Sequence, residues 1–134
     1  MLQIDGVGHD LKHGRLDLKG IVSAELAIDG GAYPEDPSGK LVGYGDMRLQ
    51  AAQAFANLRL ALRAAGAQPQ DVTRLGIYVA GYKREYLEMI DLGRRAVFGD
   101  HHPTDVLLGV ETLAHSEYLI EVEAIAVVQD EASP

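Results

Sequence analysis

The sequence predicts a two-layer α+β domain in which two helices cover one face of a β-sheet. Three observations support this fold class. The length of 134 residues and the apolar content of 47% suit one domain with a substantial core. Stretches with strand-like and helix-like patterns follow one another in the order β-β-α-β-α-β-β. Two helices are too few to cover both faces of such a sheet, so we expect both on the same face.

Two strands, each with one polar face, open the predicted sheet. In RLDLKGIVSAELAIDGG, apolar and polar residues alternate in two runs that a short connection separates. The apolar sides carry Leu16, Leu18, Gly20 and Val22 in the first run, and Leu26 and Ile28 in the second. Glu25 and Asp29 fall on the polar side of the second run. A period of two is typical of strands with one buried face.

A turn-rich loop and the first helix follow. GGAYPEDPSGKLVGYGD has the composition of a loop. Asp46 is a suitable N-cap, because its carboxylate can accept from the free N–H groups of a first helical turn. Apolar residues then recur at helical spacing to about Ala65, and we expect Gly66 to end the helix in the left-handed conformation.

The remaining chain is predicted to add a strand, a second helix and two more strands. These elements are DVTRLGIYVAG, a helix from roughly Arg84 to Phe98, and strands at about Asp105–Thr112 and Leu119–Val128. We expect residues 1–134 to form one domain, with residues 129–134 as a flexible polar tail.

The sheet face away from the helices is predicted to mix aliphatic and acidic side chains. By alternation it carries Leu107, Leu119, Ile125 and Val127 together with Glu25, Asp29, Asp105, Glu111, Glu121 and Glu123. A solvated face rarely has so many aliphatic residues, and a core rarely has so many carboxylates. Such a face suits the association of identical subunits, with clefts where they meet. We therefore expect a homo-oligomer with ligand sites between chains.

The acidic charge and the lack of cysteine limit which partners and which cellular compartment we expect. The net charge is −8 and the isoelectric point about 4.9, which disfavours nucleic acid as a partner. The absence of cysteine excludes disulfides, thiolate nucleophiles and cysteine metal sites. No signal peptide and no membrane span are expected, and a reducing cytoplasm fits the composition.

Several motifs resemble the RidA/YjgF family, the reactive intermediate deaminases. They are QAAQAFANLRLALRAAGAQPQDVTRLGIYV with its Gln50 and Asn57, RRAVF, HPTDVLLGVETL, and LIEVEAIAVV. The likeness covers roughly residues 21–128 and depends on the order and spacing of the motifs together. It implies a chorismate-mutase-like fold, a homotrimer whose sheets form a central barrel, and ligand clefts between subunits.

The resemblance also implies a changed binding site. Family members that hydrolyse imines or enamines carry PARS, whose arginine grips the substrate carboxylate, whereas this chain has PTDV and therefore Asp105 at that position. Ionised aspartate has no hydrogen to donate to a carboxylate, and its negative charge repels one. The family's TSG is DGG here, at Asp29 to Gly31. Glu121 matches a family glutamate that handles the hydrolytic water.

Asp105 and Glu121 are the expected catalytic residues. Asp105 is a candidate general base or binding group for a cationic or hydroxylated ligand. The alternative is that it caps a turn or pairs with an arginine, such as Arg15, Arg48 or Arg74. Carboxylates gathered in one cleft raise one another's pKa, which suits acid/base work. For Glu121, and for Glu123 beside it, the alternative is a polar contact inside the trimer.

Five further positions are expected to bind substrate. They are Asp29, Gly31, Tyr33, Tyr78 and Thr104. For the two tyrosines, ordinary packing at an interface is the alternative.

No metal site or cofactor is expected. Adjacent histidines on a loop point in different directions, so His101, His102 and Asp105 are a poor ligand set. We interpret His102 as a solvated loop residue, with a proton-transfer role as the alternative. Arg94 and Arg95 are most simply a solvated pair on the second helix.

The predicted function is that of a small-molecule enzyme with an altered, acidic cleft between subunits. It would hydrolyse, deaminate or tautomerise an amino or imino metabolite and would not act as the usual 2-iminoacid deaminase. A non-catalytic ligand-binding or structural trimer is the alternative, and an endoribonuclease is disfavoured by the charge. The expected partners are a small ligand and further copies of the chain.

Overall fold

The structure, a computed structural model, describes residues 2–4, 10–18 and 22–129, and up to Gly30 it describes the backbone alone. Six strands form one sheet in the order β1-β2-β3-β6-β4-β5. The strands are β1 (Leu2–Ile4), β2 (Asp10–Leu18), β3 (Val22–Ala32), β4 (Val72–Ala80), β5 (Thr104–Val110) and β6 (Ile120–Gln129). Every pairing is antiparallel except that of β4 with β5.

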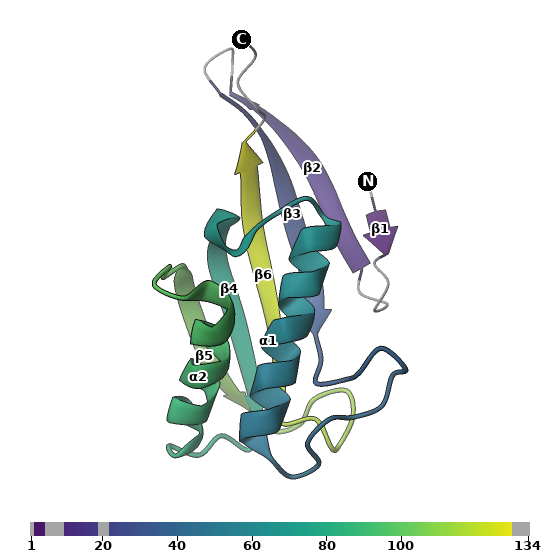
Figure 1. The fold of residues 1–134 in the computed structure, drawn as a ribbon, viewed down its shortest axis with the longest axis vertical. Coiled ribbons are helices and arrows are strands. Elements are labelled where there is room, and N and C mark those ends of the chain that lie inside the picture. The colour runs from purple at the N-terminus through teal and green to yellow at the C-terminus, as the bar shows by residue number, and fades with distance from the viewer. Residues whose placement is uncertain (1, 5–9, 19–21, 130–134) are drawn as a thin grey trace.

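Two helices, α1 (Met47–Ala64) and α2 (Tyr86–Phe98), lie on the same face of this sheet (Figure 1). A short 3-10 helix, η1 (Pro69–Asp71), leads from α1 into β4. The predicted two-layer α+β class is therefore confirmed. Neither helix is long and apolar enough to cross a membrane, within the part of the chain that the structure describes.

Both ends of α1 follow the expected local chemistry. The Asp46 carboxylate accepts from the backbone N–H of Leu49 at 3.1 Å, so it caps the first turn. Gly66 follows the helix with φ of +77°, a left-handed conformation that favours glycine. The helix spans 18 residues.

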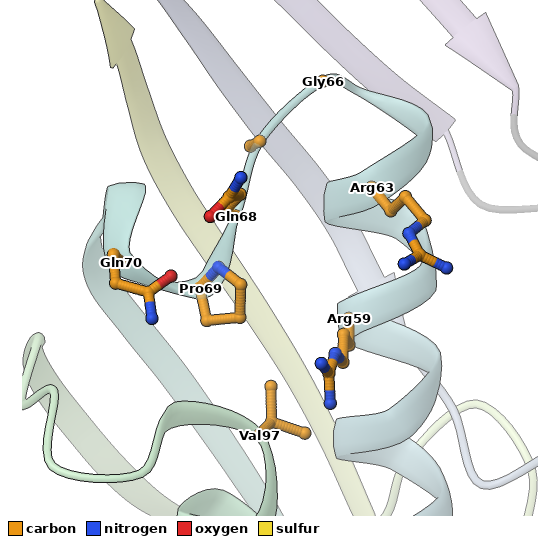
Figure 2. A pocket seen from close by; sticks show the side chains of 8 residues that line it. Arg59, Arg63, Gly66, Gln68, Pro69, Gln70 and Val97 are labelled. Atoms are coloured by element: carbon orange, nitrogen blue, oxygen red, sulfur yellow. The ribbon is translucent and has the colours of Figure 1, made fainter.

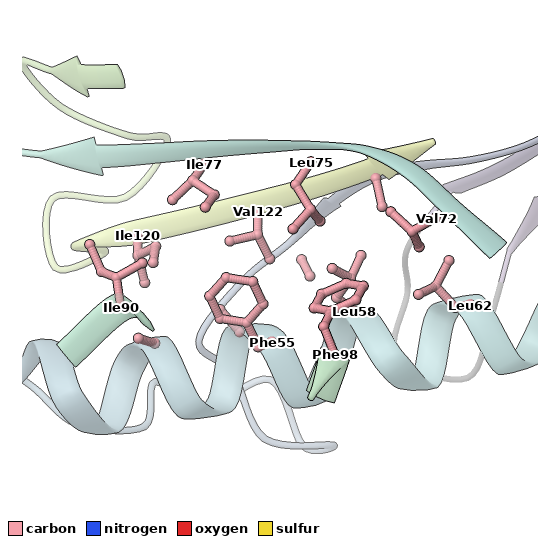
Figure 3. Close-up of a cluster of buried hydrophobic side chains, with 14 of the residues drawn as sticks. Phe55, Leu58, Leu62, Val72, Leu75, Ile77, Ile90, Phe98, Ile120 and Val122 are labelled. Carbon is pink, nitrogen blue, oxygen red and sulfur yellow. The ribbon is translucent and has the colours of Figure 1, made fainter. Parts of the chain in front are cut away.

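The core lies between the helices and the sheet (Figure 3). Its largest members include Phe55, Leu58, Leu75, Ile120 and Val122, all fully buried. Gly93 allows α2 to lie close to α1, because a Cβ there would be 3.1 Å from the backbone of Ala51. The even-numbered residues of β6 from Ile120 to Ala126 are buried, as the alternation predicted.

Some predicted boundaries were wrong near the chain ends. Val22 begins β3 and does not belong to the preceding strand, so the connection comes earlier than the pattern indicated. β2 begins at Asp10, and β1 was not predicted. Gln129 is the last residue of β6 and was expected in the tail; residues 130–134 of that tail lie outside the described residues.

The predicted orientation of β5 was also wrong. β5 runs parallel to β4, with Asp105 beside Leu75 and Leu107 beside Ile77. Residues paired in this way point to the same face, and Leu75 and Ile77 are buried under the helices. Asp105 and Leu107 therefore lie on the helix side of the sheet. Val106, Leu108 and Val110 lie on the other side.

Leu119 was likewise misplaced by the alternation. It precedes β6 and packs against the core, although we expected it on the face away from the helices. Its backbone N–H donates to the Gln50 side chain at 2.8 Å. This hydrogen bond holds the chain just before β6 against α1.

Candidate functional site

Two carboxylates and a tyrosine lie together on the sheet face away from the helices, which we call the open face. Glu121 and Glu123 of β6 point to this face, and Tyr78 of β4 is paired with Glu121. The Tyr78 hydroxyl donates to Oε1 of Glu123 at 2.6 Å. Glu121, Glu123 and Tyr78 are half-buried. We call them the carboxylate cluster.

Glycines make room for the two glutamate side chains. A Cβ on Gly31 would clash with Oε1 of Glu121, and a Cβ on Gly76 would lie 2.8 Å from Oε1 of Glu123. Gly31 has φ of +131° and lies where the β3–β6 register shifts between Asp29 and Ala32. Such a bulge redirects a strand locally, and here it brings the Gly31 backbone beside the Glu121 carboxyl group.

The surroundings of Glu121 favour its protonated form. Burial raises the pKa of Glu121, and the negative charge of Glu123 raises it further. The hydrogen bond to Glu123 raises the pKa of the Tyr78 hydroxyl, with burial adding to the effect. The cluster therefore combines a carboxyl group that can gain and lose a proton with a neighbour that accepts from Tyr78.

Buried amides of α1 hold the loop that follows β3 and the segment that precedes β6. Asn57 donates at 2.7 Å to the carbonyl oxygens of both Tyr33 and Glu35. Gln50 donates at 3.0 Å to the carbonyl oxygens of Gly43 and Glu117. The Gln50 and Asn57 side chains are thus satisfied although buried, and they tie the segments around residues 33–43 and 117–119 to the helix.

A separate pocket of about 320 Å³ lies between α2 and the start of β5. Its polar lining consists of Asp91 and Arg94 of α2, His102, and Asp105. Its apolar lining consists of Ile77, Leu87, Ile90, Pro103 and Leu107. We call this the α2–β5 pocket. It carries two carboxylates and one guanidinium, so it is mixed in charge rather than acidic throughout.

Arg94 is not the solvated residue that we expected. Its Nε and Nη2 donate to Oδ1 of Asp91 at 3.2 and 2.5 Å, and its side chain is only 14% exposed. Arg95 bonds the other oxygen, Oδ2, and is 63% exposed. The two guanidinium groups lower the pKa of Asp91, so its carboxylate stays ionised. The spacings of three and four residues along a helix could have indicated both ion pairs.

The predicted site residues fall into different places. Gly31 and Tyr78 join Glu121 at the open face, whereas Asp105 lines the α2–β5 pocket on the helix side. A single chain therefore does not bring the two expected catalytic residues together. Asp105 is exposed and forms no ion pair with a described side chain.

The other predicted binding residues have structural contacts. The Thr104 hydroxyl donates to the carbonyl oxygen of Thr73 at 2.7 Å, and Thr104 points to the face opposite Asp105. Tyr33 stacks on Tyr118 with ring centroids 5.6 Å apart. For Asp29 the structure describes only the backbone, which pairs with Ala124.

A third hollow is basic and lies away from both sites. It lies between the C-terminal half of α1 and the segment at residues 66–70 (Figure 2) and has a volume of about 510 Å³. Arg59 and Arg63 border it on one side, and Gln68, Pro69 and Gln70 on the other. None of the predicted site residues lines it. Among the described residues, no three His, Asp or Glu side chains gather closely enough to hold a metal ion.

Comparisons with known proteins agree with this fold. The Endoribonuclease L-PSP family model matches residues 18–128. The RutC family protein PH0854 of Pyrococcus horikoshii is 31% identical over 96 residues, which cover 72% of this chain and 74% of that protein.

Solved structures of Rid and YjgF proteins are similar to this chain in sequence and fold. The Rid family protein YyfB of Yersinia pestis is 29% identical with a TM-score of 0.71, over 85% of this chain and 97% of that one. The yjgF gene product of E. coli is 26% identical with a TM-score of 0.66, over 84% of each chain. From the extent of the family match, supported by these relatives, the chain belongs to the RidA/YjgF family.

Proposed function

We propose that the chain is a small-molecule enzyme of the deaminase or hydrolase type. Its substrate is an amino or imino metabolite other than the usual 2-iminoacid, and Glu121 is the acid/base residue. The observation that carries this proposal is the raised pKa of a half-buried carboxyl group on an open sheet face. A raised pKa brings a carboxyl group closer to the pH at which it can both accept and give up a proton, as general acid/base catalysis requires.

The chemistry for an imine is simple hydrolysis. Glu121 in its ionised form takes a proton from water as the water oxygen bonds to the imine carbon, and the imine nitrogen gains a proton from solvent. Glu121 then returns its proton to the nitrogen as the C–N bond of the carbinolamine breaks, and the hydroxyl group loses a proton to solvent. Ammonia leaves and a carbonyl group remains, so that one water is consumed for each ammonia released. Glu123 accepts a hydrogen bond from Tyr78. Its negative charge raises the pKa of Glu121, which favours the protonated form of Glu121.

We also propose that the functional unit is a homotrimer with clefts between its subunits. Ile125 and Val127 are only half-buried on the open face, and no described helix covers that face. The carboxylate cluster and the α2–β5 pocket lie on opposite sides of one sheet. A neighbouring copy can place its α2–β5 pocket against the cluster, which would complete a site that one chain lacks.

A ligand-binding trimer without catalysis is the second candidate. It is favoured by Asp105, which stands where the resemblance places a substrate-binding arginine. The family description names an endoribonuclease, but the net charge of −8 disfavours RNA binding by this chain.

The decisive experiment compares binding with turnover. Amine, imine and lactone metabolites are screened by thermal shift, and each ligand that stabilises the protein is assayed with wild type, Glu121→Gln and the exposed control Glu88→Gln. The proposal expects turnover that Glu121→Gln lowers by about a hundredfold or more and Glu88→Gln leaves unchanged. Ligands that bind but are never converted would support the binding trimer.

A second assay tests the substrate class. A 2-iminoacid is generated from serine by a dehydratase, and its clearance is followed with and without the protein. The proposal expects no acceleration above the spontaneous rate. Rapid clearance would show that the chain is a 2-iminoacid deaminase of the usual kind.

A further inference from the structure

We propose that Arg94 is the anion-binding residue of the α2–β5 pocket and that Asp105, on the facing wall, binds a protonated amine. The pocket then selects a small zwitterion, with the anionic group toward α2 and the ammonium group toward β5. This inference rests on the proposed function, because it assigns the substrate class of the same cleft. Position 105 then binds a cation, whereas the arginine implied there by the family resemblance binds an anion.

The guanidinium of Arg94 is held in place for such a contact. Two of its nitrogens, Nε and Nη2, bind Oδ1 of Asp91, which fixes the plane of the group. The third, Nη1, lies 3.4 Å from Nδ1 of His102, which is another lining residue of the pocket. A guanidinium fixed in this way loses little side-chain freedom when an anion binds.

The charges around Arg94 leave a net positive charge. Asp91 places one oxygen against Arg94 and the other against Arg95, so one carboxylate is shared by two guanidinium groups. One unit of positive charge therefore remains on these three residues. Because Arg95 is largely exposed, solvent screens its charge more than that of the mostly buried Arg94.

Asp105 supplies the opposite charge on the other wall. It lines the same pocket from β5 and forms no ion pair with the side chains that the structure describes. Ile77 and Leu107 also line the pocket and give it an apolar part. A volume of about 320 Å³ suits a small ligand.

A ligand with one charge satisfies only one wall. A plain carboxylate meets Arg94 but also approaches Asp105, and a plain amine meets Asp105 but also approaches Arg94. A 2-iminoacid carries a carboxylate and, when its nitrogen is unprotonated, only a neutral imine. A compound with both a carboxylate and a protonated amine matches both walls, which explains how an aspartate can replace the family's arginine without closing the site to carboxylates.

The test measures binding and needs no turnover. Isothermal titration of the full-length protein uses β-alanine as the zwitterion, with propionate and propylamine as single-charge probes of similar size. The variants are Arg94→Gln, Asp105→Asn and the matched control Arg95→Gln, which removes the guanidinium on the other oxygen of Asp91. We expect β-alanine to bind at least tenfold more tightly than either single-charge probe. Arg94→Gln and Asp105→Asn should each weaken it by about tenfold, and Arg95→Gln by about threefold or less, because Arg95 does not line the pocket and solvent screens its charge.

The remaining outcomes separate this inference from the proposed function. Equal losses in Arg94→Gln and Arg95→Gln would show that Arg94 only stabilises α2, and the inference would fail. It would also fail if propylamine or propionate bound as well as β-alanine, or if β-alanine did not bind in the millimolar range. If β-alanine binds in the expected charge-dependent way but no metabolite is turned over, the zwitterion inference holds and the enzyme proposal fails. If turnover depends on Glu121 but is unchanged in Arg94→Gln, the enzyme proposal holds and the zwitterion inference fails.

Discussion

The hydroxyl of Tyr78 donates a hydrogen bond of 2.6 Å to Oε1 of Glu123. This bond joins β4 to β6 and holds the Glu123 carboxyl group against Tyr78 on the open face. Burial raises the pKa of Glu121, and the negative charge of Glu123 adds to this rise. Two glutamates that are two residues apart on one strand therefore have different surroundings: Glu123 accepts from a tyrosine hydroxyl, and burial shifts Glu121 toward its protonated form.

The raised pKa of Glu121 predicts a pH-dependent stability difference between wild type and Glu121→Gln. Below the ordinary pKa of glutamate, Glu121 is protonated in both the folded and the unfolded chain. As the pH rises through the raised folded-state pKa, the folded protein must ionise a half-buried group, and wild type loses stability. The glutamine variant cannot ionise, so its stability relative to wild type should increase over this range.

Urea unfolding at one protein concentration, from about pH 4 to about pH 8, measures this difference. Glu88→Gln, on the exposed first turn of α2, is the control and should show no such trend. A constant difference between wild type and Glu121→Gln across the range would contradict the environment described for Glu121.

Gly31→Ala is predicted to damage both stability and the carboxylate cluster. The φ of +131° is unfavourable for alanine, and the new Cβ would displace the Glu121 carboxyl group. We expect a loss of about 1–3 kcal/mol in the free energy of unfolding together with a loss of Glu121-dependent turnover. Gly39→Ala is the matched control, since Gly39 has φ of +83° but open space around its Cβ position. Chemical unfolding and the activity assay should show that only Gly31→Ala affects turnover.

Local patterns predicted most of the fold because they report burial on one face. The helical period and the Asp46 cap located α1, and the alternation in β6 identified its buried residues. The same reasoning failed for β5, an edge strand with apolar residues at both Leu107 and Leu108. Its orientation depends on the parallel pairing with β4, which alternation within one strand cannot reveal.

The candidate site was predicted only in part for a related reason. Glu121 was identified through the family resemblance, and its place beside Gly31 follows from a bulge that joins distant strands. Arg94 was missed because a charged pair on a helix is usually solvated. Its burial depends on how α2 lies over β5, which is a tertiary relationship.

Asn57→Leu is predicted to destabilise the loop that follows β3. Leucine has a similar size but removes the two 2.7 Å hydrogen bonds to the carbonyl oxygens of Tyr33 and Glu35, and the 3.0 Å bond that Asn57 accepts from Gln53. Each such bond contributes about 0.5–1.5 kcal/mol, so we expect a loss of about 2 kcal/mol or more in unfolding free energy. Gln53→Leu removes only two bonds, that to Asn57 and a longer 3.2 Å bond to the Glu35 carbonyl, from a half-buried side chain, and it should cost less. Chemical denaturation of the two variants checks this order, and a larger loss in Gln53→Leu would contradict it.

Leu108→Lys is predicted to weaken association of the subunits. Leu108 is paired with Tyr78, so it points to the open face, where it is 49% exposed. In the proposed trimer a neighbouring subunit covers this face, and a buried lysine ammonium would have no partner there. We expect the dissociation constant to rise by about tenfold or more.

Leu60→Lys is the matched control for this change. Leu60 is 47% exposed on α1, on the opposite side of the molecule from the open face, so the two leucines differ in position but hardly in exposure. Sedimentation equilibrium should therefore give a trimer for wild type and Leu60→Lys and smaller species for Leu108→Lys at the same concentration. If wild type is a monomer, or if both variants dissociate equally, the open face is not the subunit contact. The carboxylate cluster would then have to function without a neighbouring α2–β5 pocket.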